Sequence, residues 1–336
     1  MALKRGLTTV LGSVLAVFLL YLAFRNVDGP GLKKQLGTVG LPVLLAMVSL
    51  SVAGLFCRGW RWFLLLARPI ASREFWALQR ALAVSYAVGN LASRFGEVVR
   101  IGMARSETKR AISALTGTVV LDRLIFDGLA FGIMLGSGLL LNREALVSAF
   151  PQAPVLVWSL SMLVLGGGMA LFWLALAPKS VLQLLRWMRL DRIPKVGPIL
   201  LNLIGQTSEG LRVLTSPRFL LRAFLVDVLV WFLPFAYFCL VLWVFEVEAP
   251  LAEIWFVFSL TVVGVLIPSP GGLGSYHLMV TLGLTQILGV DTEKSAAIAL
   301  VSHGVNYLTL FAVGLPAWWM SRLAVKRRGV QAEIVR

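Results

Sequence analysis

Long, nearly unbroken runs of apolar residues dominate the pattern of the chain. A membrane-spanning helix needs about 20 mostly apolar residues, and six runs of this sequence approach or exceed that length. They lie at about residues 7–24, 38–57, 110–140, 154–177, 219–245 and 294–321. The pattern therefore predicts an all-α polytopic membrane protein with about six full spans.

Two further apolar stretches, 73–104 and 250–289, are interrupted near their middle by glycine, proline or charged residues. Each is typical of two helices joined at membrane depth, as a re-entrant or broken helical hairpin. A broken helix exposes backbone polar groups, which lipid tolerates only where protein or water covers them. These interruptions are therefore candidates for a functional site.

The basic residues between the runs predict the orientation. Lys4 and Arg5 precede the first span, which places the N-terminus in the cytoplasm. Counting sides from there leaves five basic and seven acidic residues outside and nearly all other basic residues inside. The inner side would receive, among others, Arg58, Arg61, Arg68, Arg73, Arg100, Arg105, Lys109, Arg186 and Arg322. Both chain termini are thus predicted to be cytoplasmic.

The same count brings one hairpin in from each side, which is the sequence signature of an inverted repeat. Hairpin 73–104 would face the cytoplasm within a membrane half 1–177, and hairpin 250–289 would face outside within a half 216–336. The segment 178–215 between them has apolar and basic residues at helical spacing. It is predicted to be an amphipathic helix on the cytoplasmic leaflet, or else a connector whose basic residues only set the topology.

Composition narrows the class of protein. The chain is 58% hydrophobic and 14% charged, against about 45–50% and 25% in soluble domains, with a mean hydropathy of +0.86. These values exclude disorder, a nucleic-acid-binding domain and an ordinary cytosolic enzyme. The net charge of +15 then belongs to cytoplasmic loops and to contacts with anionic lipid. Two cysteines and two histidines predict no disulfide framework, metal or cofactor site.

Five charged residues lie inside the predicted apolar region: Arg94 and Glu97 near the tip of the first hairpin, and Asp122, Arg123 and Asp127 within run 110–140. Each costs about 2.5–3.5 kcal/mol at the bilayer centre. The planar guanidinium suits bidentate binding of phosphate, so the two arginines are predicted to bind a headgroup that the acids help to orient. The alternative is internal pairing of Arg123 with Asp127 and of Arg94 with Glu97.

The second hairpin offers a glycine turn at 271–274, whose N–H groups at the start of a helix favour an anion. His277 follows the turn, and His303 lies in the helix after it, so both histidines are candidates for headgroup binding or proton transfer. Two other polar residues are interpreted structurally. Asp227 is predicted to pair with Arg222 at the interface, and Arg80 to extend toward the cytoplasmic face.

Three motifs resemble one family. Arg94 with 96–100 resembles its R-x-G-E-x-x-R element, Asp122-Arg123 resembles its acidic–arginine pair, and 268–274 resembles its P-x-P-G-G-x-G element. Over about residues 10–325 the chain is similar to the lysylphosphatidylglycerol synthase transmembrane (flippase-like) family. The resemblance implies a lipid-translocating membrane domain, whose best-known relatives move aminoacylated phosphatidylglycerol between leaflets.

The chain also departs from that family pattern. Ala92 stands where the family often has proline, and His277 stands where it often has glutamate. The soluble aminoacyl-transferase domain of the full-length synthases is not expected in these 336 residues. Lipid aminoacylation is therefore not expected of this chain, and the headgroup of its lipid stays open.

The sequence as a whole predicts a flippase for an anionic or phosphate-bearing lipid, of phospholipid or polyprenyl-phosphate type, in a bacterial or archaeal cytoplasmic membrane. Its partners would be such lipids and a coupling proton or ion, with no nucleic acid. The predicted substrate-binding residues are Arg94, Glu97, Arg100, Asp122, Arg123, Asp127, Ser269, Gly271, Gly272, Gly274, Tyr276, His277, His303 and Asn306. The alternatives are an integral membrane enzyme acting on a lipid-linked phosphate, or a scaffold in envelope biosynthesis.

Overall fold

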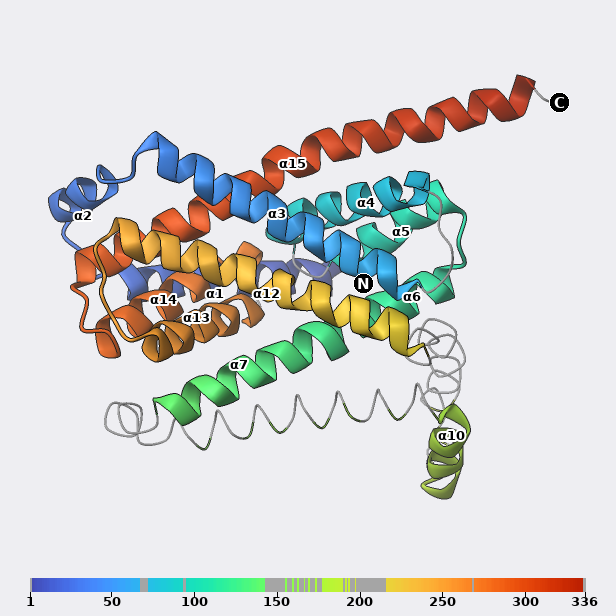
Figure 1. Cartoon of the computed structure of the whole chain (residues 1–336), viewed down its shortest axis with the longest axis horizontal. Coiled ribbons are helices and arrows are strands. Elements are labelled where there is room, and N and C mark those ends of the chain that lie inside the picture. Colours follow the sequence, from blue (N-terminus) through green and yellow to red (C-terminus); the bar gives the residue numbers. More distant parts are fainter. Residues whose placement is uncertain are drawn as a thin grey trace.

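The computed structural model describes residues 2–66, 72–92, 95–142, 177–189, 216–267 and 269–334, with isolated positions between 155 and 197. All regular structure in these residues is helical, as predicted (Figure 1). The first half contains α1 (Ala2–Phe24), α2 (Gly29–Leu36), α3 (Leu41–Leu65), α4 (Ser72–Leu91), α5 (Gly96–Thr108), α6 (Ile112–Val120), the π-helix η1 (Leu121–Asp127) and α7 (Gly128–Leu141). There follow α10 (Pro178–Trp187), α12 (Pro217–Val244), α13 (Leu251–Leu266), the 3-10 turn η4 (Pro270–Gly272), α14 (Ser275–Gln286) and α15 (Thr292–Ile334).

Four helical segments are long and apolar enough to cross a membrane. They are α3, the continuous run Ile112–Leu141, α12 and the stretch Thr292–Val325 of α15. The bent pair Ser13–Phe24 and Gly29–Leu36 makes a fifth if it counts as one span. The described residues thus give four or five candidate spans where the sequence predicts about six, and the predicted span 154–177 lies mostly outside them.

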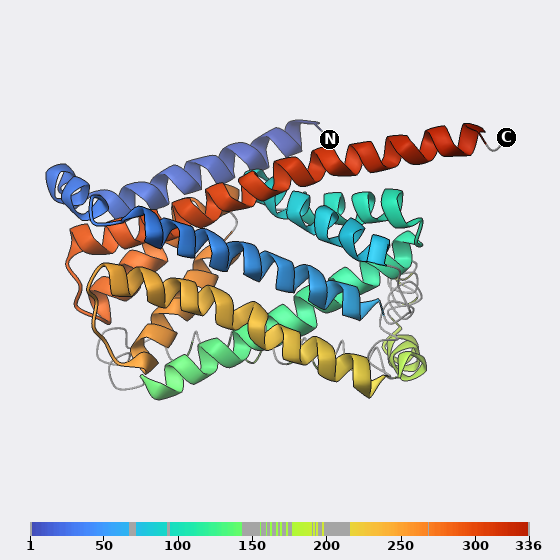
Figure 2. The same cartoon turned by 45° about the horizontal axis from the view of Figure 1, so that its top comes forward.

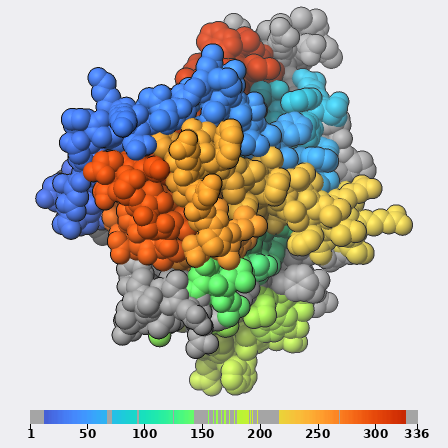
Figure 3. Space-filling model, turned by 60° about the vertical axis from the view of Figure 1, so that its left-hand side comes forward, coloured from blue at the N-terminus to red at the C-terminus, as the bar shows by residue number. Residues whose placement is uncertain are grey.

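A sharp corner ends the first helix. The chain bends by 90° between α1 and α2, because Asp28 caps the new helix by accepting a hydrogen bond from the Gly31 amide at 2.8 Å. Helix α2 then lies beside the start of α15, where the Asp28 amide donates to Glu293 at 3.5 Å (Figure 3). The first apolar run therefore stops at Phe24, as its sequence indicates.

Both predicted hairpins are present as pairs of neighbouring helices, α4 with α5 and α13 with α14 (Figures 1 and 2). Glycine permits the close packing in each pair. A Cβ at Gly96 would lie 2.7 Å from the Ser85 carbonyl oxygen, and one at Gly264 would lie 2.8 Å from Tyr276 Cα. Whether either hairpin is re-entrant, and from which side, stays a prediction.

The interruptions of the two hairpins touch each other. A Cβ at Gly271 would lie 2.4 Å from the carbonyl oxygen of Asn90, at the end of α4. One stretch of α15 holds both interruptions, since Tyr307 donates to the Asn90 carbonyl at 3.2 Å and His303 Nε2 lies 3.0 Å from the Gly271 carbonyl. The two broken regions, far apart in sequence, thus meet in one place.

Apolar side chains pack in the interior of the molecule and are also exposed on its outer surface. The largest buried cluster joins α12, α13, α14 and α15 through residues such as Phe238, Val257, Val280 and Ile298. Large apolar side chains are also exposed on the surface: Val52, Phe224, Leu229, Phe232, Trp243 and Leu308 among them. An outer surface of this kind is typical of a protein that faces lipid.

The start of α1 and the end of α15 point in the same direction, toward the end of the molecule where α10 lies (Figure 2). Helix α10 begins the predicted amphipathic segment, with Val181 and Leu185 half-buried and Arg186 exposed. Most of the rest of segment 178–215 lies outside the described residues.

Candidate functional site

A cluster of four arginines and four carboxylates lies where α3, α5, η1 and α12 meet; we name it the ion-pair cluster. Its members are Arg58 and Arg61 on α3, Glu97 and Arg100 on α5, Asp122, Arg123 and Asp127 on η1, and Asp227 on α12. The formal charges of the eight side chains cancel. Asp227 lies ten residues into α12, or about 15 Å along it, so the cluster is inside the helical bundle.

The π-helix places three of these charges. In an α-helix, residues five apart face different sides, because the helix repeats every 3.6 residues. The wider i→i+5 hydrogen bonding of η1 brings Asp122 and Asp127 toward one side, and both contact the same guanidinium, that of Arg61. Single π turns are frequent at functional sites, and the pattern of the sequence does not predict this one.

Arg61 is the centre of the cluster and is fully buried. Its Nε donates to Asp122 at 2.8 Å, its Nη2 donates to Asp127 at 2.7 Å, and its Nη1 pairs with Asp227. Two predictions were therefore wrong. Arg61 does not lie in a cytoplasmic flank, and Asp227 pairs across to α3 instead of with Arg222 on its own helix.

The error at Arg61 has a local cause. The predicted span ends at Cys57, because basic residues such as Arg58 and Arg61 are typical of the membrane surface, whereas α3 continues to Leu65. The segment after Arg58 is mostly aromatic or apolar, with Trp60, Trp62 and Phe63 among its residues. That continued apolar pattern was the signal that could have placed Arg61 inside the bundle.

Arg100 is a second fully buried arginine. Its Nη1 donates to the other oxygen of Asp122 at 2.8 Å, and its guanidinium lies 4.0 Å from the centre of the Trp62 ring. Asp122 thus bridges Arg61 and Arg100 and is only 2% exposed. Within the described residues, Nε and Nη2 of Arg100 have no hydrogen-bond partner. Arg100 was placed on the inner face by the charge count, and the structure buries it.

Arg123 forms the open edge of the cluster. It contacts Glu97 at 2.6 Å and Asp127 at 2.8 Å, and it donates to the Tyr86 hydroxyl at 3.2 Å. The Arg123 and Glu97 side chains are 33% and 35% exposed, whereas that of Arg61 is 0% exposed. The predicted pairing of Arg123 with Asp127 is present. Arg94 lies outside the described residues, and Glu97 pairs with Arg123 and, at 3.5 Å, with Arg100.

Other arginines on the hairpin face carboxylates too. Arg80, predicted to extend toward the cytoplasm, pairs with the buried Glu107 of α5. Arg110 contacts Glu74 at 2.9 Å. These pairs connect α4 with the end of α5 and with the residues that follow it. They hold the first hairpin together.

The glycine turn of the second hairpin needs its glycines. Gly271, Gly272 and Gly274 have φ of +59°, +73° and +82°, a region in which other residues are strained. The amides of Gly272 and Leu273 donate within the turn, at 3.2 and 3.0 Å. The turn thus has fewer N–H groups for an anion than its length suggests.

Ser269 closes the same turn. Its hydroxyl is buried and lies 2.7 Å from the hydroxyl of Ser275, which in turn donates to the Gly272 carbonyl at 3.2 Å. This contact joins the start of the turn to the first residue of α14. Ser269 therefore fixes the shape of the turn.

The two histidines lie together in a buried aromatic group. Their ring centres are 4.9 Å apart, and His303 stacks on Tyr276 at 4.7 Å. Tyr276 donates to the Ser302 hydroxyl at 3.0 Å. His277 is 3% exposed, and its Nδ1 has no hydrogen-bond partner within the described residues. Asn306 lies half-buried on α15, one turn after His303.

The predicted site residues therefore form two groups. One is the ion-pair cluster, and the other consists of the glycine turn with the two histidines. The end of α4 connects them, since Tyr86 accepts from Arg123 and the Asn90 carbonyl accepts from Tyr307. In the part of the chain that the structure describes, no group of three or more His, Cys, Asp or Glu is arranged to hold a metal ion.

An all-helical bundle with four or five candidate spans, exposed apolar surfaces and interior charges is a multi-pass membrane protein. Residues 9–314 match the family model described as the lysylphosphatidylglycerol synthase TM region, so the chain belongs to that family. No curated protein and no solved structure matches the chain. The membership confirms the resemblance seen in the three motifs and gives the chain a lipid-related function.

Proposed function

We propose that the protein is a flippase that moves a phosphate-bearing lipid across the cytoplasmic membrane of a bacterium or archaeon. The observation that carries the proposal is Arg123, a partly exposed arginine at the edge of an otherwise closed ion-pair cluster. A guanidinium offers two parallel N–H bonds to phosphate. The lipid headgroup would therefore bind at this edge.

A phosphate would bind Arg123 in place of a carboxylate, because Arg123 already pairs with two of them, Glu97 and Asp127. Glu97 is the carboxylate most easily replaced. Its side chain is 35% exposed, against 16% for Asp127, 10% for Asp227 and 2% for Asp122. Asp127 is also held by Arg61 and Arg58. We therefore assign Glu97 as the group that occupies Arg123 between lipids and yields to the headgroup.

The meeting of the two hairpins supports a path for the lipid. Asn90 and Gly271 touch, and both are held by α15. In an inverted repeat, alternating access comes from movement of one half against the other around such a meeting point. Separation of the two interruptions would open the path beside Arg123. His277 and His303, next to Gly271, are the residues we assign to a coupling proton.

The test is lipid translocation by the purified protein in vesicles, followed with a fluorescent phospholipid whose outer-leaflet fraction is destroyed by a reductant. Arg123→Ala is expected to lower the rate at least about tenfold, the effect of losing one charge-assisted interaction. Arg123→Lys keeps the charge but not the bidentate geometry, so an intermediate rate is expected. Glu97→Gln, which removes the competing charge, should bind lipid more tightly, as measured by lipid binding to the purified protein.

Arg222→Ala is the matched control, because Arg222 is an exposed arginine on α12. It should leave the rate unchanged, and thermal unfolding checks that each variant is folded. Wild-type translocation by folded Arg123→Ala would overturn the assignment. Mass spectrometry of the recovered lipid addresses the alternatives: a changed mass would indicate an enzyme, and neither movement nor change would indicate a scaffold.

A further inference from the structure

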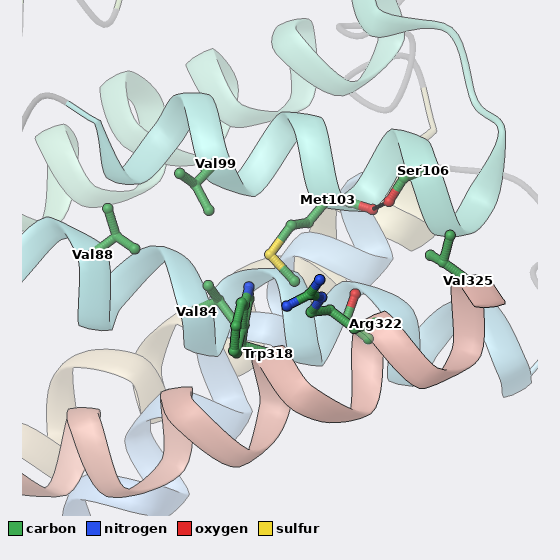
Figure 4. A pocket seen from close by; sticks show the side chains of 9 residues that line it. Val84, Val88, Val99, Met103, Ser106, Trp318, Arg322 and Val325 are labelled. Atoms are coloured by element: carbon green, nitrogen blue, oxygen red, sulfur yellow. Dashed lines mark hydrogen bonds between the residues drawn. The ribbon is translucent and has the colours of Figure 1, made fainter.

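A groove lies between the first hairpin and α15 (Figure 4). Its walls are Val84 and Val88 of α4, Val99 and Met103 of α5, and Trp318 and Arg322 of α15, and its volume is about 530 Å³. This volume is within the range of about 300–1,000 Å³ for small-molecule sites. On the opposite face of α5, Glu97 and Arg100 contact the cluster, so the groove is a separate feature.

The divergence of α15 from the hairpin produces the groove. At Gly314 the helices are in close contact, since a Cβ there would lie 2.5 Å from the Ala87 side chain and 3.0 Å from the Ala83 carbonyl oxygen. Beyond this point α15 leaves α4 and α5, and Trp318 and Val325 remain 43% and 41% exposed. The space between the helices therefore opens toward the surroundings of the protein.

The chemistry of the groove changes along its length. Its inner end, at Val88 and Val99 beside the interruption of the hairpin, is lined by aliphatic side chains. Its outer end, near the end of α5, carries Ser106 and Arg322. A membrane phospholipid has the same polarity, with an apolar chain directed inward and a phosphate at the surface.

Arg322 is available for an anion. Its guanidinium lies 4.9 Å from the centre of the Trp318 ring, which holds it at the mouth of the groove. Within the described residues it has no carboxylate partner, whereas Arg80, Arg100 and Arg110 of the same hairpin region each contact one. An unpaired cation beside an apolar groove matches the charge of a phospholipid phosphate.

We infer that this groove binds an anionic phospholipid, with one acyl chain between α5 and α15 and the phosphate at Arg322. The bound lipid fills the space that α15 leaves and connects the first hairpin to the last helix. It occupies a site of its own, and the assignment does not depend on translocation through the ion-pair cluster.

The test uses phosphatidylglycerol with a photoactivatable diazirine in its acyl chain, in nanodiscs containing the full chain. Adducts on peptides of α5 and α15 are expected, and phosphatidylcholine with the same chain should give fewer. Arg322→Gln should reduce the preference for phosphatidylglycerol about fivefold, the contribution of one basic residue near an anionic surface. Val325→Trp, which projects a large ring into the groove from a 41% exposed position, should remove the adducts.

Arg222→Gln is the matched control and should retain both the adducts and the preference for phosphatidylglycerol. Adducts spread evenly over the apolar surface, or unchanged in folded Val325→Trp, would overturn the inference. Equal labelling by the two lipids in wild type would overturn the role of Arg322. These outcomes are independent of the translocation rate, so they separate this site from the proposed transport site.

Discussion

Because Arg61 is buried, the ion-pair cluster affects the stability of the protein as well as its proposed function. Burying a guanidinium costs free energy unless its charge and N–H groups are paired. At Arg61 three carboxylates, one for each nitrogen, provide that pairing. Removing one partner of a buried ion pair costs about 3–5 kcal/mol, because an uncompensated charge remains. The residues proposed to bind the headgroup and those that hold the bundle are thus neighbours in one network.

Asp227→Asn is therefore expected to lower the free energy of unfolding by about 3–5 kcal/mol. The change removes one negative charge from a balanced set of eight and leaves Arg61 underpaired. The measurement is equilibrium unfolding in mixed micelles. Arg222→Gln, on the same helix, is the control and should stay within about 0.5 kcal/mol of wild type. Equal stabilities for the two variants would contradict the pairing seen here and favour the pairing that the sequence suggested.

The residue scale also shows what the sequence can reveal about the site. Asp122, Arg123 and Asp127 are charges inside an apolar run, so the free-energy cost of burying them made them recognisable. Asp227 was instead assigned to an interfacial pair with Arg222, because spacing along a helix reports only neighbours on that helix, and its partner is Arg61 of α3. Pairing between helices depends on packing that no single segment encodes.

At the scale of elements, the contact between the hairpins gives a test with an internal control. Gly271 and Gly289 both have positive φ, +59° and +65°. A Cβ at Gly271 would lie 2.4 Å from the Asn90 carbonyl oxygen, whereas one at Gly289 would meet nothing within 4 Å. An alanine at either position strains the backbone by about 1–2 kcal/mol, but only the first must also push two elements apart.

Gly271→Ala is thus expected to destabilise the protein by about 1–3 kcal/mol more than Gly289→Ala, the usual range for overpacking. It should also change translocation, since it alters the contact at which we propose that the path opens. Thermal unfolding and the vesicle assay measure the two effects. Equal behaviour of the two alanine variants would show that the contact with Asn90 is not tight in solution.

The elements themselves were largely predictable. Both interrupted hairpins occur where glycine, proline and charge break the apolar runs, and α3, α12 and α15 follow long apolar stretches. The π-helix was not predictable, because its residues have ordinary helical spacing and the extra width arises where Asp122 and Asp127 both reach Arg61. The apolar pattern likewise did not predict the 90° corner after α1, although Asp28 is a typical helix-capping residue.

At the scale of the whole molecule, the charged residues that give the net charge of +15 form two groups, those inside and those outside the ion-pair cluster. The interior arginines of the ion-pair cluster are balanced by carboxylates, so they contribute nothing to the net charge. The excess lies in the segments that the charge count places on the cytoplasmic side, where anionic lipid attracts basic residues. The predicted orientation therefore rests on the charges outside the cluster, and transport is proposed for those within it.

This division predicts a topology that labelling can check. Helices α2 and α10 lie at opposite ends of the molecule (Figure 1), and Lys34 and Gln183 are exposed on them. In a background with Cys57 and Cys239 replaced by alanine, Lys34→Cys should react with an impermeant maleimide in intact cells. Gln183→Cys should react only after permeabilisation, because the basic end is predicted to face the cytoplasm. The cysteine-free parent is the control. The reverse pattern would invert the orientation, and labelling of both from one side would mean that the bundle between α2 and α10 does not cross the membrane.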